Sequence, residues 1–484
     1  MKFKAIQRII GILLMIFSFS MLPPVLVGWL MDDVTHALQP FYHSFGIIFA
    51  IGLVLWLPVR REKRDLRLRD GFLIAVLFWS ALSAAGTAPF LLSQALELSL
   101  GSAVFETVSG FTTTGATVIV GLDGLPASLV FYRLELHWLG GMGILVLAVA
   151  LMPMLGVGGM QLYRAEAPGP VKDEKLTPRI TETAKLLWYI YLILTFICTL
   201  IYKWAGMTWF DAICHAFSVL STGGFSTHDS SMIYFNSPLI DYITIVFMFL
   251  AGVNFSLHFL VWRTKNIRIY FYDSEFRLYL AIVVIVALVC AAILYAYGTY
   301  NGVWESLRYA LFHVISIMTS TGLLIADHSV WPSVIPIVLI FVSVIGGCAG
   351  STSGGMKVIR FLLLMKQGGR EINQLAHPKA QILIKVNHKP VPEVIIKSVW
   401  GFAAMYVATY VIFMLGLMAA GHDQVTAFSA VAACLNNMGV GLGEVASSFA
   451  VLDEFSKWWL SFAMIMGRLE LFTVLVLLSP MFWR

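Results

Sequence analysis

The sequence has little charge: 12% of its 484 residues are Asp, Glu, Lys or Arg, whereas 59% are hydrophobic. Soluble domains carry roughly 25% charged residues, so this composition excludes an ordinary soluble protein. A membrane-spanning helix needs about 20 apolar residues. The apolar runs of that order centre on Ile6–Leu30, Phe41–Val59, Gly71–Leu92, Leu129–Leu155, Leu186–Ala205, Pro238–Trp262, Leu278–Tyr297, Pro332–Met365, Ile395–Ala420 and Lys457–Pro480. We therefore predict a multi-pass membrane protein with ten spans.

Cysteine is sparse as well, and the five cysteines form no CxxC pair. They are Cys198, Cys214, Cys290, Cys348 and Cys434. This scatter argues against a disulfide framework and against a zinc site. We expect these cysteines to be small, buried, apolar side chains.

A cleavable signal peptide is also missing. The basic start Met1–Lys4 precedes a run of spanning length, and no small-residue cleavage site follows it. We expect the first helix to be retained.

Enzyme motifs are not found. No metal-ligand spacing or nucleophile motif connects the acids and histidines near the short segments, which are Glu135, His137, His215, His228 and His313. We predict that the chain is not an enzyme and that these histidines are structural.

The 32 lysines and arginines are unevenly distributed. Most precede the first span or follow the second, fourth, sixth and eighth. The positive-inside rule then places these loops and both termini in the cytoplasm. The basic loop Arg60–Asp70 is interpreted as a topology signal that contacts anionic lipid headgroups, with a nucleic-acid patch as the less favoured alternative.

After Gly71, one pattern occurs four times: a spanning helix, a shorter amphipathic segment, a polar turn and a second spanning helix. The turns are Thr113–Ala116, Thr222–Phe225, Ser320–Leu323 and Asn437–Val440. Their glycines lie roughly 100 residues apart, which indicates internal duplication. The predicted divisions are 1–70 (hairpin and basic loop), 71–185, 186–276, 277–394 and 395–484.

The segments before the turns are too short to cross a bilayer, so we expect re-entrant half-helices. They are Gly101–Gly110, Met207–Leu220, Val303–Met318 and Val425–Leu435. A half-helix that ends at a turn directs its negative dipole end there, which favours a cation. The acids Glu106, Asp211, Glu305 and Asp423 are expected in the first turns of these helices; attraction of cations to the pore mouth is the weaker alternative.

The turns themselves combine threonine, serine or asparagine with glycine. An extended strand of this kind can direct carbonyl oxygens at a dehydrating cation, and glycine supplies the backbone angles. The alternative is that each is a simple loop turn, which four matching copies make less favoured.

The eighth apolar run is interrupted by the glycine-rich stretch Gly346–Gly355. A helix does not run well through so many glycines. The stretch lacks the Gly-Lys-Ser/Thr ending of a phosphate-binding loop. We interpret it as a gate below the turns; a kink needed for packing is the alternative.

Arg468 lies midway along the last apolar run. A central arginine costs on the order of 3 kcal/mol or more on insertion scales, so it should face a polar interior. There it would act as an electrostatic barrier to cation flow. A buried structural pair with a carboxylate or with carbonyls is the alternative. The polar stretches Gly158–Lys185 and Lys366–Lys397 are docking sites for a cytoplasmic partner or solvated linkers.

Taken together, these motifs resemble the bacterial TrkH/TrkG potassium-uptake subunits of the Trk/Ktr/HKT cation transporter superfamily. The resemblance covers nearly the whole chain. It rests on Thr112–Thr117, Tyr163–Glu166, Pro168–Pro170, Gly223–His228, Gly346–Thr352, Leu435–Gly439, Gly467–Glu470 and Phe482–Arg484.

The resemblance implies an all-α polytopic fold: two N-terminal helices plus four helix–pore loop–helix repeats in pseudo-fourfold arrangement around one ion pore. It implies potassium and rubidium uptake across the bacterial inner membrane, with no organic cofactor. It also implies a homodimer and a TrkA-like cytoplasmic nucleotide-binding ring subunit that controls the gate.

The resemblance also assigns residues. The filter carbonyls map onto Thr113, Thr114, Thr222, Gly223, Ser320, Thr321, Asn437 and Met438. The filter glycines map onto Gly115, Gly224, Gly322 and Gly439. The gate maps onto Gly346, Gly347, Gly350, Ser351, Thr352, Gly354 and Gly355, with Arg468 as the pore arginine.

The sequence departs from the family pattern at several positions. The third turn reads Ser320–Leu323 instead of Thr-Ala-Gly-Phe, Met438 and Val440 replace the common leucine and proline, and Ser353 replaces a glycine. These changes leave the sodium/potassium preference open, as well as the choice between a proton-coupled symporter and a gated channel. The alternatives are a secondary carrier of an organic solute, with an alternating-access site, and a sodium-coupled cation symporter.

Overall fold

The computed structural model describes residues 3–62, 68–151 and 176–483. In this part of the chain the only strands are β1 (Lys385–Val386) and β2 (Lys389–Pro390), which form a small antiparallel hairpin. The all-α prediction is therefore confirmed. Residues 63–67 of the predicted lipid-contacting loop and residues 158–175 of the predicted docking stretch lie outside the described residues.

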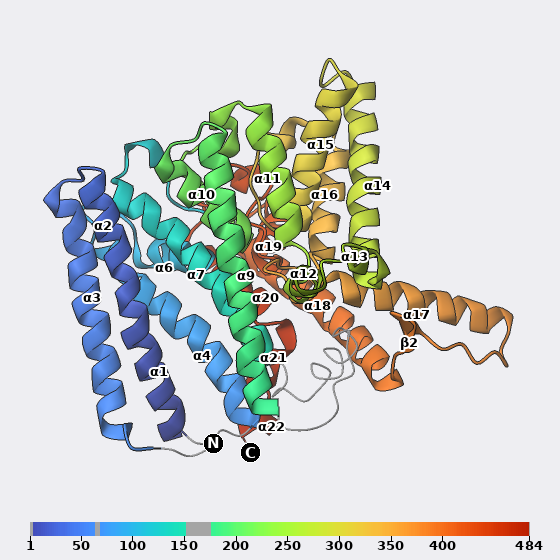
Figure 1. The fold of residues 1–484 in the computed structure, drawn as a ribbon, viewed down its shortest axis with the longest axis horizontal. Coiled ribbons are helices and arrows are strands. Elements are labelled where there is room, and N and C mark those ends of the chain that lie inside the picture. Colours follow the sequence, from blue (N-terminus) through green and yellow to red (C-terminus); the bar gives the residue numbers. More distant parts are fainter. Residues whose placement is uncertain (1–2, 63–67, 152–175, 484) are drawn as a thin grey trace.

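The chain begins with a helical hairpin. It contains α1 (Phe3–Ser18), η1 (Phe19–Met21), α2 (Leu22–Leu30), α3 (Thr35–Trp56) and η2 (Leu57–Val59). Figure 1 shows α1 and α3 side by side at one edge of the molecule. A Cβ on Gly11 would lie 2.8 Å from the Gly52 carbonyl oxygen, so these glycines allow the two helices to approach closely.

The helices that follow the hairpin can be grouped by the four predicted units. The first contains α4 (Leu68–Gly86), α5 (Ala88–Leu92), α6 (Leu100–Phe111), η3 (Leu122–Gly124) and α7 (Ala127–Leu151). The second contains α9 (Leu176–Trp204), α10 (Trp209–Ser221), η4 (Ser231–Phe235), α11 (Pro238–Ala251), α12 (Phe255–Thr264) and α13 (Arg268–Tyr272). The third contains α14 (Ser274–Ala296), α15 (Val303–Met318), η5 (His328–Val330), α16 (Val334–Ile345) and α17 (Val358–Ala376). The fourth contains α18 (Glu393–Ala419), α19 (Gln424–Leu435), η6 (Gly443–Val445), α20 (Glu454–Arg468), α21 (Leu471–Leu478) and α22 (Pro480–Trp483).

The segments predicted to be half-helices correspond to the four short helices α6, α10, α15 and α19, although α10 begins at Trp209 and not at Met207. Their helical conformation is therefore confirmed. Polar side chains cap α6 (Ser99), α10 (Thr208) and α19 (Asp423). Asp211 and Glu305 lie in first turns, as expected. The prediction for Glu106 is wrong, because it lies in the second half of α6 and is fully buried.

Six described helices are long and apolar enough to cross a membrane, and two bent helix pairs raise this number to eight. The predicted break in the eighth apolar run is confirmed, since α16 ends at Ile345 and α17 begins at Val358. Two further breaks were not predicted: α11 and α12 meet at 97°, and α20 and α21 meet at 113°. The remaining predicted spans correspond to α7 and to α16 with α17. At 12 residues, α16 is shorter than a bilayer requires.

The short helices lie at the centre of the molecule. Along α19, nine of the twelve residues are buried, whereas the apolar windows of the six continuous spans are 22–44% buried. This is the pattern expected when long helices surround the short ones and present one side to lipid. The surrounding long helices fix the positions of the C-terminal ends of the short helices, where the turns begin.

Candidate functional site

Each short helix ends with the same backbone motif. The first residues of the turns are Thr113, Thr222, Ser320 and Asn437, with left-handed φ values of 52°, 53°, 55° and 53°. Each donates its N–H to the carbonyl three residues before it at 3.1–3.2 Å, and the next residue donates to the carbonyl five residues before it at 2.7–2.8 Å. This is a Schellman motif, which glycine usually closes. A residue with a Cβ costs roughly 1–2 kcal/mol there, and such strain often marks a functional constraint.

The glycines of the four turns face one another in a closed ring. Their φ values are 85° (Gly115), 92° (Gly224), 75° (Gly322) and 79° (Gly439). A Cβ added to each would lie within 2.1–2.3 Å of a carbonyl oxygen in the next turn: Gly223 for Gly115, Thr321 for Gly224, Met438 for Gly322 and Thr114 for Gly439. The sequence of contacts returns to the first turn, so the structure brings all four predicted turns together. No side chain larger than hydrogen fits at these glycines.

Several polar side chains around the ring are hydrogen-bonded to one another. The hydroxyls of Thr112 and Thr114 are hydrogen-bonded at 2.8 Å, as are those of Thr319 and Thr321. Asn437 Nδ2 donates to the Thr114 hydroxyl at 2.9 Å, which joins the fourth turn to the first. These side chains are buried, whereas the four glycines are partly exposed. The accessible surface of the ring is therefore largely main chain.

The C-terminal ends of all four short helices meet at this ring. Each carries roughly half a negative charge from the helix dipole, so the four ends together favour a cation. Within residues 3–62, 68–151 and 176–483, His, Cys, Asp and Glu form no group that could hold a metal ion.

The glycine-rich loop 346–355 lies directly against the ring. Gly354 N donates to Ser320 Oγ at 2.5 Å, and Gly355 N donates to the Asn436 carbonyl at 3.2 Å. Thr352 Oγ1 donates to the Leu220 carbonyl at 3.0 Å, near the end of α10. The predicted gate residues are therefore brought together with the second, third and fourth turns.

Arg468 connects this loop to the remaining turn. It ends α20 at the 113° bend, is 8% exposed, and donates through Nη2 to the Thr352 carbonyl at 3.0 Å and to the Thr113 hydroxyl. The contacts with a hydroxyl and a carbonyl place a positive charge between the ring and the loop. Glu470, two residues after Arg468, accepts a hydrogen bond from Arg360 Nη2 at 2.6 Å.

Groups distant in sequence hold the other side of the loop. Glu275 Oε1, on α14, accepts from Ala349 N at 2.7 Å and from Ile359 N at 3.1 Å. Cys348 N donates to the carbonyl of Gly252, at the α11–α12 break. A cavity adjoins the loop, and its charged lining residues are Lys357, Arg360, Arg468 and Glu470.

Besides the bend between α20 and α21, two parts of this site were not predicted from the sequence. One is the break at Gly252–Asn254; Asn254, whose side chain caps α12, was the available signal. The other is a buried ion pair between Glu106 and Arg133, with Nε and Oε1 2.8 Å apart. Two opposite charges in apolar segments were the signal for it.

Comparison with known proteins gives a consistent picture. The family described as TrkH, cation transport protein, matches residues 37–484. The chain is 51% identical to the Trk system potassium uptake protein TrkH of Vibrio parahaemolyticus, over all of both chains. It is 42% identical to the Trk system potassium uptake protein TrkG of Escherichia coli, over 99% of each chain. The crystal structure of the potassium transporter TrkH from Vibrio parahaemolyticus superimposes with a TM-score of 0.93 over all of both chains, at 48% identity.

Proposed function

This chain belongs to the TrkH family of cation transport proteins, and we propose that it takes up potassium, and rubidium, through a filter formed by the four turns. The family comprises transporters and not enzymes, and the helices long and apolar enough to cross a membrane make the chain a multi-pass membrane protein. Potassium is the transported ion and not a resident cofactor. Potassium uptake is also the function that the names of the relatives describe.

The closed ring of glycine contacts is the observation that carries the proposal. Backbone carbonyls that converge on one axis can replace the water around an alkali ion. The proposed filter carbonyls are those of Thr113, Thr114, Thr222, Gly223, Ser320, Thr321, Asn437 and Met438. The mutual support of the turns keeps the ring from collapsing around a smaller ion.

The loop 346–355 and Arg468 are the proposed gate. The loop contacts the turns through Ser320 and Asn436, and Arg468 contacts both the loop and Thr113. A fixed positive charge at this place repels a passing cation. Conduction would require the loop and the guanidinium to move aside.

The wider setting is proposed from the family resemblance. The protein would be a homodimer in the bacterial inner membrane, with both termini in the cytoplasm. A TrkA-like nucleotide-binding ring would dock from the cytoplasm. The exposed face of α17 and the β1–β2 hairpin, which project from the body in Figure 1, are the candidate contact.

Rubidium uptake into proteoliposomes tests this function. We expect potassium to compete with labelled rubidium and sodium to compete much more weakly. Equal competition by sodium would contradict the proposal that the turns form a potassium-selective filter. Saturable exchange of an organic solute, without cation flux, would favour a secondary carrier instead.

A further inference from the structure

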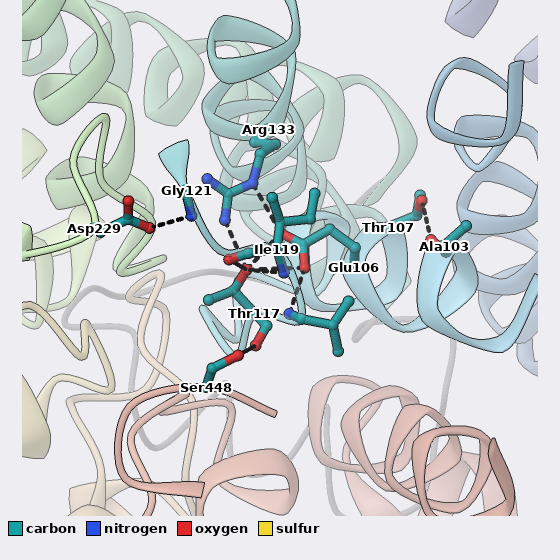
Figure 2. Close-up of polar contacts among 10 residues, drawn as sticks. Ala103, Glu106, Thr107, Thr117, Ile119, Gly121, Arg133, Asp229 and Ser448 are labelled. Carbon is teal, nitrogen blue, oxygen red and sulfur yellow. Dashed lines mark hydrogen bonds and ion pairs between the residues drawn. The ribbon is translucent and has the colours of Figure 1, made fainter. Parts of the chain in front are cut away.

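Glu106 is a carboxylate in an unexpected place. It is fully buried near the C-terminal half of α6, where the helix dipole disfavours a negative charge. A buried charge is costly unless hydrogen bonds and an opposite charge compensate it. Its two oxygens accept from Arg133 Nε at 2.8 Å, from Val118 N at 2.9 Å and from the Thr117 hydroxyl at 3.0 Å (Figure 2).

Arg133 extends this contact from the first turn to the second. Its side chain, on α7, is 1% exposed, and Nη2 donates to Thr117 Oγ1 at 2.9 Å. Its Cζ lies 4.2 Å from the ring centre of Phe225, the residue that follows Gly224. The guanidinium thus contacts the strand that leaves turn one and the residue that leaves turn two.

Thr117, which is bonded to both Glu106 and Arg133, also contacts the fourth unit. Its carbonyl accepts from Phe449 N at 2.8 Å. The same carbonyl accepts from Ser448 Oγ at 3.2 Å (Figure 2). A separate bond, from Gly121 N to Asp229 at 3.0 Å, also joins the segments that follow turns one and two. The ion pair therefore lies where three of the four units meet behind the ring.

The other units use weaker groups at the matching position, nine residues before the turn glycine. In the second unit, His215 Nε2 is hydrogen-bonded to Ser226 at 3.0 Å. In the third, His313 Nε2 donates to the Ala326 carbonyl at 3.0 Å. In the fourth the residue is Ala430, which has no polar side chain. Among these four positions the ion pair occurs only in the first unit.

We propose that Glu106 and Arg133 are positioning residues that set the spacing between turns one and two, and thereby the preference for potassium over sodium. This inference rests on the proposed filter. A carbonyl ring selects the larger ion only if it resists contraction, and the pair braces the ring from behind without contacting the ion. Arg133 Nε lies 2.8 Å from Glu106 Oε1 and neutralises the carboxylate, so attraction of cations is not the role of Glu106.

The test compares variants by rubidium uptake into proteoliposomes, with potassium or sodium as competitor. Glu106→Gln keeps an acceptor for Val118 N but leaves the Arg133 charge unpaired. We expect the potassium/sodium ratio to fall about fivefold, which corresponds to about 1 kcal/mol of lost discrimination at 1.4 kcal/mol per tenfold. The double variant Glu106→Gln/Arg133→Gln restores neutrality and should recover part of the ratio.

Glu305→Gln is the matched control, because it makes the same chemical change in the first turn of α15, away from the ring. Its ratio should equal that of the unmodified protein. If Glu106→Gln does not give a monodisperse protein, Arg133→Lys is the variant that tests the proposal. It keeps both charges but loses the planar guanidinium, with its several donors and its stacking on Phe225. It should still lower the ratio.

Two failures are distinguishable. An unmodified protein that does not discriminate potassium from sodium would overturn the proposed function. A discriminating unmodified protein whose folded Glu106→Gln or Arg133→Lys variant keeps the same ratio would overturn only this inference and leave the pair a purely stabilising contact.

Discussion

The ring of turns and the loop 346–355 are both rich in glycine, but they are held in different ways. Each turn is closed by hydrogen bonds to its own helix, three and five residues back. The loop is held by groups distant in sequence, among them Glu275, Ser320 and Arg468. A turn closed by its own helix stays intact when its neighbours move, whereas such a loop is released when a few contacts break. The comparison supports the proposal of a rigid filter beside a displaceable gate.

The two regions also differ in symmetry. The turn motif is present in all four units, but among residues 3–62, 68–151 and 176–483 the long glycine loop occurs in the third unit alone. The second and fourth units have sharp bends at Gly252–Asn254 and Leu469–Glu470. Cys348 N bonds to the Gly252 carbonyl, and Thr352 O accepts from Arg468. One asymmetric loop thus uses breaks in its neighbours to reach below a ring of four similar turns.

The largest effect is expected from a Cβ in the ring. In Gly115→Ala the methyl group would lie 2.2 Å from the Gly223 carbonyl oxygen, so the ring must distort. Rubidium flux should fall by more than about 100-fold, since the strain of a left-handed alanine adds to a backbone clash.

Gly121→Ala is the matched control for this change. Its φ of 82° is close to the 85° of Gly115, but nothing lies within 4 Å of its added Cβ. Backbone strain alone should lower stability by about 1 kcal/mol and leave flux nearly unchanged. Equal loss of flux in the two variants would show that the ring contact is irrelevant.

The next effect concerns the charge between the two regions. Arg468→Gln removes the positive charge beside Thr113 and Thr352. We expect rubidium flux to rise roughly tenfold, as loss of about 1.5 kcal/mol of repulsion predicts, with an unchanged potassium/sodium ratio. Arg308→Gln, which removes an arginine paired with Asp241 at 3.3 Å, should not raise flux. Unchanged flux in the Arg468 variant would contradict the proposal that its charge is a barrier to cation flow.

A smaller effect should follow from loosening the loop while the turns stay intact. In Glu275→Gln the acceptor for Ala349 N and Ile359 N becomes neutral, and charge-assisted bonds are roughly twice as strong as neutral ones. Basal flux should rise about threefold at constant selectivity. A change in the potassium/sodium ratio would mean that the loop and the ring are not separable.

The smallest effect is expected from the loss of a helix cap that is remote from both regions. Thr208 accepts from Asp211 N at 3.0 Å at the start of α10, so Thr208→Ala should cost about 1 kcal/mol and lower the melting temperature by roughly 1–2 °C. Ser237→Ala is the control, since Ser237 caps α11 without a side-chain hydrogen bond. Altered selectivity in the Thr208 variant would contradict a locally closed filter.

Local patterns in the sequence predicted the short helices, the four turns and the break after Ile345, because each depends on a few neighbouring residues. The fully buried position of Glu106 was not predictable in this way. An acid near a helix start is usually a first-turn residue, and only the tertiary approach of Arg133 and Thr117 compensates a charge at this depth. The bend at Leu469–Glu470 likewise depends on Arg468 reaching Thr113 across 355 residues of sequence.

The central claim is that main-chain oxygens of the four turns bind an alkali ion on one axis. The most direct test is diffraction from crystals grown in rubidium, with anomalous density as the readout. We predict rubidium density enclosed by the carbonyls of Thr114, Gly223, Thr321 and Met438. Rubidium bound elsewhere, with these carbonyls turned away from a common centre, would contradict the account.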